Sequence, residues 1–267
     1  MPETTCAIIG GTGVYHAELL ADSVEHVIHT PYGDAKCVVG LHEGRPVAFM
    51  PRHGVRHNIP PHEINYRANI MALKQLGVRD VFATAAVGSL RRSLAPGSLV
   101  IIDQFLDFTK ARHGTFFSDG APVSHVDMTT PYCPRLRGVL QDTAAQLELS
   151  VAAEGVYVCT EGPRFETPAE IRAFAQMGGD VVGMTSVPEV VLAREAGICY
   201  ASVAMVTNYG AGLADAPLTH REVLDEMARN ADRLRRLFFT AIAHAKTGRA
   251  CSCAPPAAMV STEGDRP

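Results

Sequence analysis

Short apolar segments bounded by turn-forming residues recur along this chain, and their alternation with helical stretches constrains the fold more than any other feature of the sequence. Such segments are typical of strands, and the stretches between them carry the spacing and capping residues of helices. Strands that alternate with helices predict an α/β fold, with a mixed, largely parallel β-sheet flanked by helices on both faces. The expected strands are residues 7–9, 47–50, 81–84, 99–102, 156–158 and 200–206, and the expected helices are 61–76, 135–147, a helix that begins after Thr167, 188–196 and 220–244.

The length and the apolar content favour one domain. The chain has 267 residues, of which 47% are hydrophobic, so it can bury a large core. No linker rich in Pro, Ser or Gly interrupts the sequence before Lys246, where it changes to small residues, prolines and charges without periodicity. We therefore expect a single domain over residues 1–246 and a disordered C-terminal tail over residues 247–267.

Charge and hydropathy argue against two classes of partner. The 24 basic and 28 acidic residues give a net charge of -4, without the basic excess that binds a phosphate backbone, so nucleic acid is not an expected partner. No stretch approaches the roughly 18 apolar residues that indicate a membrane span, and the N-terminal residues lack the basic region of a signal peptide. We expect no membrane partner and a cytoplasmic location.

The seven cysteines are mostly scattered, which is typical of small buried side chains rather than of a disulfide framework. Cys251 and Cys253 are the exception, because a single serine separates them. A local disulfide, a redox pair and two thiols on a frayed tail all remain open for this pair. No group of His and Cys has the sequence spacing of metal ligands, so we expect no metal and no cofactor.

A glycine-rich turn follows the first expected strand. The backbone amides of residues 10–13 and the Thr12 hydroxyl can hold an anion, although a purely structural turn is equally compatible with the pattern. Its spacing matches neither GxGxxG nor GxxxxGK[ST], which argues against a dinucleotide fingerprint and against a P-loop.

Other predicted strand ends also suit an anion. Residues 51–57 contain two arginines and two histidines, among them Arg52 and His53, and forked arginine donors match the oxygens of a doubly charged anion. A solvated loop is the alternative for this segment. Ala85 and Ala86 end another strand in small residues, and Thr185 lies at an expected helix N-terminus, where anions are favoured.

Two further segments offer groups that can recognise a planar ring. Phe165 can cover such a ring while Glu166 accepts hydrogen bonds from its edge, although helix capping by Thr167 with Glu166 in solvent is the alternative. Asn208 follows the strand 200–206, where an asparagine is usually part of a turn. Taken alone, neither segment defines a function.

The ordered series of these motifs resembles the trimeric purine nucleoside phosphorylase and methylthioadenosine phosphorylase family. The series consists of GGTG, PRHG, INYRAN, AVGSL, IDQFLDFT, TEGPRFET, GMTSVPEVVLARE and VTNYG, and the resemblance runs from Ile8 to about Ala243. It implies the nucleoside phosphorylase fold, phosphorolysis of a purine nucleoside in purine salvage, inorganic phosphate as co-substrate, and a homotrimer, with a hexamer as the alternative.

The resemblance also implies roles for particular residues. Ala85 departs from close relatives specific for methylthioadenosine, which often carry Thr there, so one hydroxyl contact to phosphate is missing. His125 matches a histidine that the family lends to the ribose site of a neighbouring subunit. The implied phosphate-binding residues are Thr12, Arg52, His53, Ala85, Ala86 and Thr185, the implied substrate-binding residues are Phe165, Glu166, Met184, Asn208, Tyr209, Gly210, His220 and His125, and the implied catalytic residues are Asn208, Glu166 and His53.

The implied base site favours 6-oxopurines, such as those of inosine and guanosine. The Glu166 carboxylate can accept from N1–H, and the Asn208 amide can donate to O6 and bond N7, whereas adenine presents the opposite pattern. Adenine-accepting members typically have Asp in place of Asn208. His220 matches the position that meets a 5′-hydroxyl, although Thr219 and Glu222 also form a capping box there.

The sequence thus predicts an inosine and guanosine phosphorylase in which bound phosphate attacks C1′ as the base leaves. A methylthioinosine phosphorylase would keep Glu166 and Asn208 but leave His220 without a hydroxyl partner. A methylthioadenosine phosphorylase conflicts with the base site. A nucleoside-binding module without catalysis is the alternative from another class, and it would have no use for a second anion site.

Overall fold

The computed structural model describes residues 4–10, 20–56, 58–118, 120, 124–214, 220–245 and 251–253. The predicted strands and helices are all present within this part of the chain. The strands are β1 (Cys6–Gly10), β2 (Ala21–Thr30), β3 (Gly33–His42), β4 (Arg45–Pro51), β5 (Asp80–Ser89), β6 (Leu99–Ile101), β7 (Gln104–Phe108), β8 (Val151–Ala152), β9 (Val156–Thr160), β10 (Val181–Gly183) and β11 (Cys199–Tyr209). The helices are the 3₁₀ turn η2 (Pro61–Glu63), α1 (Tyr66–Gln75), α2 (Pro134–Gln146), α3 (Pro168–Gln176), α4 (Ser186–Glu195) and α5 (His220–His244).

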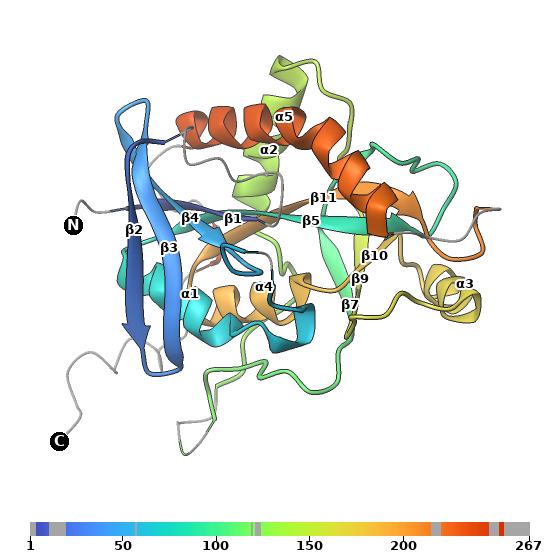
Figure 1. Ribbon diagram of the computed structural model, residues 1–267, viewed down its shortest axis with the longest axis horizontal. Helices are drawn as coiled ribbons and strands as arrows, with labels where there is room; N and C mark the ends of the chain where they lie inside the picture. Colours follow the sequence, from blue (N-terminus) through green and yellow to red (C-terminus); the bar gives the residue numbers. More distant parts are fainter. Residues whose placement is uncertain are drawn as a thin grey trace.

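All of these strands belong to one mixed sheet, so the fold is a single α/β domain, as expected (Figure 1). The strand order is β2-β3-β4-β1-β5-β10-β9-β7, and β11 pairs with β5 and with β6, which in turn pairs with β8. The pairs β1–β4, β1–β5 and β5–β11 at the centre are parallel, whereas β2–β3 and β3–β4 at one edge are antiparallel. The carboxyl ends of β5 and β11 therefore lie together, which is where ligands bind in sheets of this kind.

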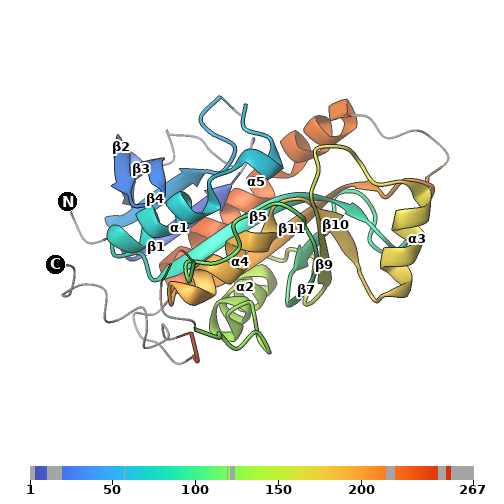
Figure 2. The ribbon, with the colours of Figure 1, turned by 90° about the horizontal axis from the view of Figure 1, so that it is seen from below.

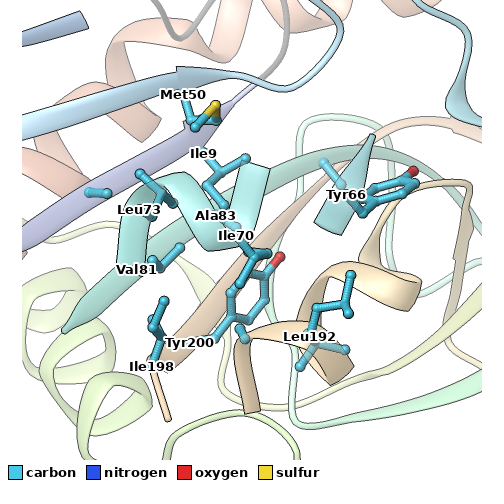
Figure 3. Close-up of a cluster of buried hydrophobic side chains, with 14 of the residues drawn as sticks. Ile9, Met50, Tyr66, Ile70, Leu73, Val81, Ala83, Leu192, Ile198 and Tyr200 are labelled. Carbon is cyan, nitrogen blue, oxygen red and sulfur yellow. The ribbon is translucent and has the colours of Figure 1, made fainter. Parts of the chain in front are cut away.

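Helices cover both faces of the sheet, with α1 and α4 on one face and α2 and α5 on the other (Figures 1 and 2). Successive side chains of a strand point to opposite faces. Accordingly Ile9 and Val81 pack towards α1 and α4, whereas their neighbours Ile8 and Phe82 pack towards α2 and α5. Figure 3 shows the first of these two cores, in which Ile70 of α1 and Leu192 of α4 meet the sheet.

Local sequence signals explain the helix boundaries. Thr167 caps α3 as expected, because its side chain accepts from the backbone N–H of Glu170 while the Glu170 side chain accepts from the backbone N–H of Thr167. The expected helix 61–76 is divided, since the Asn65 side chain accepts from the backbone N–H of Ala68 and starts α1 after the 3₁₀ turn.

The sequence pattern missed the edge strands β2 and β3 and the short strands β7, β8 and β10. Strand β2 is exposed along most of its length and has no continuous apolar run, so its pairing with β3 decides its conformation. Within the expected tail, residues 251–253 differ from the expectation of disorder, because Cys253 is buried and Cys251 packs against the core beneath α2 and α5. None of the helices in the described ranges is long and apolar enough to cross a membrane.

Candidate active site

A pocket opens at the carboxyl ends of β5 and β11, with β10, the segment after β4 and the first turns of α5 as further walls. These elements come from widely separated parts of the sequence, and the parallel pairing of β1, β4, β5 and β11 brings their ends to the same edge. Of the residues singled out from the sequence, the pocket is lined by Arg52, His53, Ala85, Ala86, Phe165, Glu166, Met184, Thr185, Asn208 and Gly210.

Arg52 follows β4 and is buried, with 2% of its surface exposed. Its Nε and Nη2 donate to the two carboxylate oxygens of Glu189, both at 2.7 Å, and its Nη1 donates to the Thr84 carbonyl oxygen at 2.8 Å. Burial by itself would lower the pKa of the Arg52 guanidinium, but the Glu189 carboxylate raises it well above its ordinary value. A guanidinium has five N–H groups, so these bonds leave two of them for a ligand in the pocket.

Glu189, in α4, holds that guanidinium in place. Its side chain is fully buried, and its Oε1 also accepts from the Tyr200 hydroxyl at 2.7 Å. A buried carboxylate needs a charged or hydrogen-bonding partner, and here it has both. Glu189 is therefore a positioning residue for Arg52, a role that none of the sequence motifs predicted. The sequence signal that could have indicated this role is a glutamate within an apolar stretch of helix, because a charged side chain is rarely buried without a partner.

Thr185 and His53 also line the pocket. Thr185 immediately precedes α4, its side chain makes no capping bond, and its backbone N–H donates to the Tyr157 hydroxyl at 3.3 Å. Only glycine fits at position 183, because a Cβ there would lie 2.1 Å from that hydroxyl. The His53 Nδ1 lies 2.9 Å from the Ile59 carbonyl oxygen, so Nδ1–H donates to this oxygen and fixes the ring.

Glu166 faces the pocket rather than solvent, even though Thr167 caps α3 as the alternative interpretation required. Its Oε1 accepts from the Thr160 hydroxyl at 2.6 Å. Burial raises the pKa of the Glu166 carboxyl, and the bond from Thr160 opposes this rise. Phe165 lies beside it with 40% of its surface exposed, so an aromatic ring borders the entrance.

Asn208 lies where β11 departs from regular pairing. The register with β5 shifts between Val206 and Asn208, and a bulge of this kind re-aims a side chain. The Thr207 hydroxyl lies 2.8 Å from Asn208 Oδ1 and 3.3 Å from the Val87 carbonyl, and we assign its one proton to the shorter contact. Asn208 Nδ2 donates to the Tyr209 carbonyl at 2.9 Å, which leaves its second N–H for a ligand.

Arg112 ties together the two segments that carry two walls of the pocket, one leading to Phe165 and Glu166 and the other holding Met184 and Thr185. Its guanidinium donates to the carbonyl oxygens of Thr160 and Glu161 on one segment, at 3.1 and 2.8 Å, and to those of Met184 and Val187 on another, at 2.7 and 2.6 Å. The side chain is 2% exposed, so these charged hydrogen bonds are shielded from water. No local sequence pattern marks Arg112, because nothing near it in the sequence indicates four carbonyl partners.

Replacing Arg112 with Lys is expected to lower the free energy of unfolding on the order of 3 kcal/mol, since one ammonium cannot reach both walls. The KM for the ligand of the pocket should rise as well. Urea unfolding at fixed protein concentration measures the first effect. Arg164→Lys is the matched control, because Arg164 pairs with Glu170 in an exposed position and should cost under about 1 kcal/mol. Equal effects for the two variants would contradict the bridging role.

Of the other four residues singled out from the sequence, two are described and lie outside the pocket lining, and the side chains of the other two lie outside the described residues. The Tyr209 hydroxyl donates to the Arg92 carbonyl at 3.3 Å, so the geometry does not support a substrate contact for its ring. His125 is exposed on the chain outside the pocket. Thr12 and the side chain of His220 lie outside the described residues. The backbone of His220 begins α5, one helical turn before Val223 and Leu224, which do line the pocket.

Comparison with known proteins identifies the family. Residues 5–243 match the model of the phosphorylase superfamily. The chain is 54% identical to a protein of Moorella thermoacetica named "Probable 6-oxopurine nucleoside phosphorylase", covering 95% of this chain and 98% of the relative. It is 49% identical to the 6-oxopurine nucleoside phosphorylase of Pyrococcus furiosus, covering 92% and 95%. Its structure is similar to that of methylthioadenosine phosphorylase from Schistosoma mansoni in complex with adenine, with a TM-score of 0.87, 36% identity and coverage of 90% and 91%. The chain therefore belongs to the phosphorylase superfamily and, within it, to the nucleoside phosphorylases, which are pentosyltransferases.

Proposed function

We propose that this protein cleaves 6-oxopurine nucleosides, inosine and guanosine, with inorganic phosphate to give the free base and ribose 1-phosphate. One observation carries the proposal: a single pocket is lined by a buried, charged guanidinium, by a carboxylate and by a carboxamide that keeps one N–H uncommitted. The relatives named 6-oxopurine nucleoside phosphorylase support the same substrate class.

The phosphate end of the proposed site is built from Arg52, His53 and Thr185, with the strand end at Ala85 and Ala86 beside them. The two uncommitted N–H groups of Arg52 suit phosphate oxygens. Phosphate held there attacks C1′ as the bond to the base breaks, and its negative charge stabilises the positive charge that develops on the sugar. The new bond joins a phosphate oxygen to C1′, and the electrons of the broken bond leave with the base.

The base end is built from Glu166 and Asn208. A 6-oxopurine offers N1–H to the Glu166 carboxylate and O6 to the second N–H of Asn208 Nδ2. Charge that accumulates on the departing base is stabilised by the amide. Adenine would place the lone pair of N1 against the carboxylate, which costs on the order of 1 to 3 kcal/mol in a buried site.

A second candidate is S-methyl-5′-thioinosine phosphorylase. The pocket wall from α5 carries Val223, Leu224 and Met227, and such apolar side chains suit a 5′-methylthio group. S-methyl-5′-thioadenosine, the third candidate, fits this wall equally well but conflicts with Glu166 and Asn208. The proposed role of His220 as a partner of a 5′-hydroxyl favours ordinary nucleosides.

Base release from inosine, guanosine, adenosine, methylthioinosine and methylthioadenosine, each with and without phosphate, tests the proposal. Phosphate-dependent release from inosine and guanosine is expected. A preference for methylthioinosine would move the assignment to the second candidate, and a preference for adenine nucleosides would overturn the base assignments. Nucleoside binding without phosphate-dependent release would indicate a binding module.

The activity on inosine is expected to fall on the acid side of its pH profile as Glu166 takes up a proton. The ionised form accepts from N1–H, and burial raises the pKa of this carboxyl above its ordinary value of about 4.3, so the fall should begin at a higher pH than an exposed glutamate would cause. The profile of kcat/KM measures this. Glu166→Gln should lower activity and remove the fall at low pH. If this variant keeps the same fall at low pH, the titrating group is not Glu166.

We also propose a cytoplasmic homotrimer, with a hexamer as the alternative, in which His125 reaches the ribose site of a neighbouring subunit. The exposure of His125 on the single chain supports this arrangement. Light scattering measures the molar mass in solution and so gives the number of subunits in the assembly. Mixing His125→Ala chains with an inactive Asn208 variant tests the sharing, because mixed trimers would regain complete sites only if the histidine acts across the boundary.

A further inference from the structure

Four cysteines from three separate segments converge at the end of β11 that lies away from the pocket. Cys133 precedes α2, Cys199 begins β11, and Cys251 and Cys253 belong to the C-terminal segment; the four Sγ atoms all lie within 4.8 Å of one another. Nine residue steps of β11 separate Cys199 from Asn208, a distance of about 30 Å. The cluster is therefore separate from the nucleoside pocket.

The fold fixes two of these cysteines without help from the C-terminal segment. The backbone N–H of Cys133 donates to the Tyr200 carbonyl at 2.8 Å, which places Cys133 beside the start of β11. The backbone N–H of Cys199 donates to the Arg79 carbonyl at 2.8 Å. Cys251 and Cys253 then complete the cluster, and the Sγ atoms of Cys199 and Cys251 are 3.4 Å apart. Because the members lie far apart in the sequence, local ligand spacing gives no sign of the cluster.

The arrangement matches the sulfur geometry of a tetrahedral metal site. Zinc bound by four thiolates at about 2.3 Å separates its sulfurs by roughly 3.8 Å from one another, and soft thiolate ligands select zinc and similar ions. Mutual proximity of all four sulfurs is what such a site requires, whereas disulfides require only proximity within pairs. Cys133, Cys199 and Cys253 are buried and Cys251 is partly exposed, which gives an ion a route to the site.

Two arginines supply positive charge at the cluster. Arg194 is 6% exposed, and its Nη1 lies 3.1 Å from the Sγ of Cys253. Arg135 lies against Cys199; its Nη2 is paired with the Asp80 carboxylate, whereas its Nε and Nη1 are buried without a hydrogen-bond partner among the described residues. A zinc ion with four thiolates carries a net charge of minus two; the Arg194 guanidinium donates to one sulfur and offsets part of that charge, and the uncommitted N–H groups of Arg135 are available to the others.

We propose that Cys133, Cys199, Cys251 and Cys253 bind one zinc ion, which fastens the C-terminal segment to the start of β11 and the N-terminus of α2. Each thiol releases its proton to solvent as its sulfur bonds the metal, so no oxidant or reductant is needed. The role is structural, because four protein ligands leave no open position on a tetrahedral ion. This site does not depend on the proposed nucleoside chemistry.

Metal binding by the full-length reduced chain tests the proposal. Cobalt(II) is added without oxygen as a spectroscopic probe, zinc is then added to displace it, and bound zinc is counted by elemental analysis after gel filtration. The wild type should hold one zinc ion for each chain and show the visible absorption of tetrahedral cobalt thiolate. Cys251→Ser/Cys253→Ser should lose both signals, and Ser252→Ala, in the same segment, is the matched control that should keep them.

Circular dichroism and turnover of the nucleoside substrate show that each variant is folded, since the substituted residues lie at the far end of β11 from the pocket. Cys251→Ser alone is the milder variant should the double substitution disturb folding. It should bind zinc at least about tenfold more weakly. A reduced wild type that binds neither metal overturns the proposal, and so does a protein whose mass shows two disulfides and which takes up no metal after reduction.

Discussion

Asn208→Asp is expected to lower kcat/KM for inosine by roughly 5- to 150-fold, which corresponds to about 1 to 3 kcal/mol. A carboxylate has no N–H to donate to O6 and would face that oxygen with like charge. The same carboxylate can accept from the amino group of adenine, so the activity on adenosine should rise relative to that on inosine. Steady-state rates with both nucleosides at saturating phosphate measure the change.

Asn65→Asp is the matched control for this prediction. It adds the same charge, keeps the oxygen that accepts from the Ala68 N–H at the start of α1, and lies outside the pocket. Its ratio of inosine to adenosine activity should equal that of the wild type. An unchanged ratio in Asn208→Asp would show that Asn208 does not recognise the base.

Removing Glu189 is expected to have the largest effect on stability. Glu189→Leu leaves the charge of Arg52 buried without its carboxylate, and breaking a buried ion pair from one side costs about 3 to 5 kcal/mol. Arg52→Met/Glu189→Leu removes both charges, and replacement of a buried pair by apolar side chains is often neutral, so most of the lost stability should return. Urea unfolding of the three proteins at one concentration measures this.

The double variant also separates stability from function. It should fold and yet lose phosphate-dependent cleavage by about 100-fold or more in kcat/KM for phosphate, because the forked donors of Arg52 are absent. If the restored fold also restores phosphorolysis, Arg52 does not bind phosphate. If Glu189→Leu alone unfolds at the same urea concentration as the wild type, the ion pair does not hold the Arg52 side chain.

Much of the fold could be predicted from the sequence because its signals are local. Apolar runs predicted the central strands, and the N-cap at Thr167 predicted the start of α3, where the structure shows a capping box with Glu170. Ten of the residues selected from the motifs line one pocket. The edge strand β2 has no apolar run, so its existence depends on pairing with β3 and could not be predicted locally.

The sequence by itself determined which segments become strands and helices and which ends of them carry chemically useful groups. Only the tertiary structure decided the partners of those groups. It places Glu189 against Arg52 across 137 residues of sequence, Arg112 between the segments that carry two walls of the pocket, and Cys133 beside Cys253. The physical reason is the distance along the chain over which each effect acts. Hydrophobic periodicity and capping act within a few residues, whereas the charge of a buried side chain is compensated by whichever group the packing of the sheet and helices places next to it.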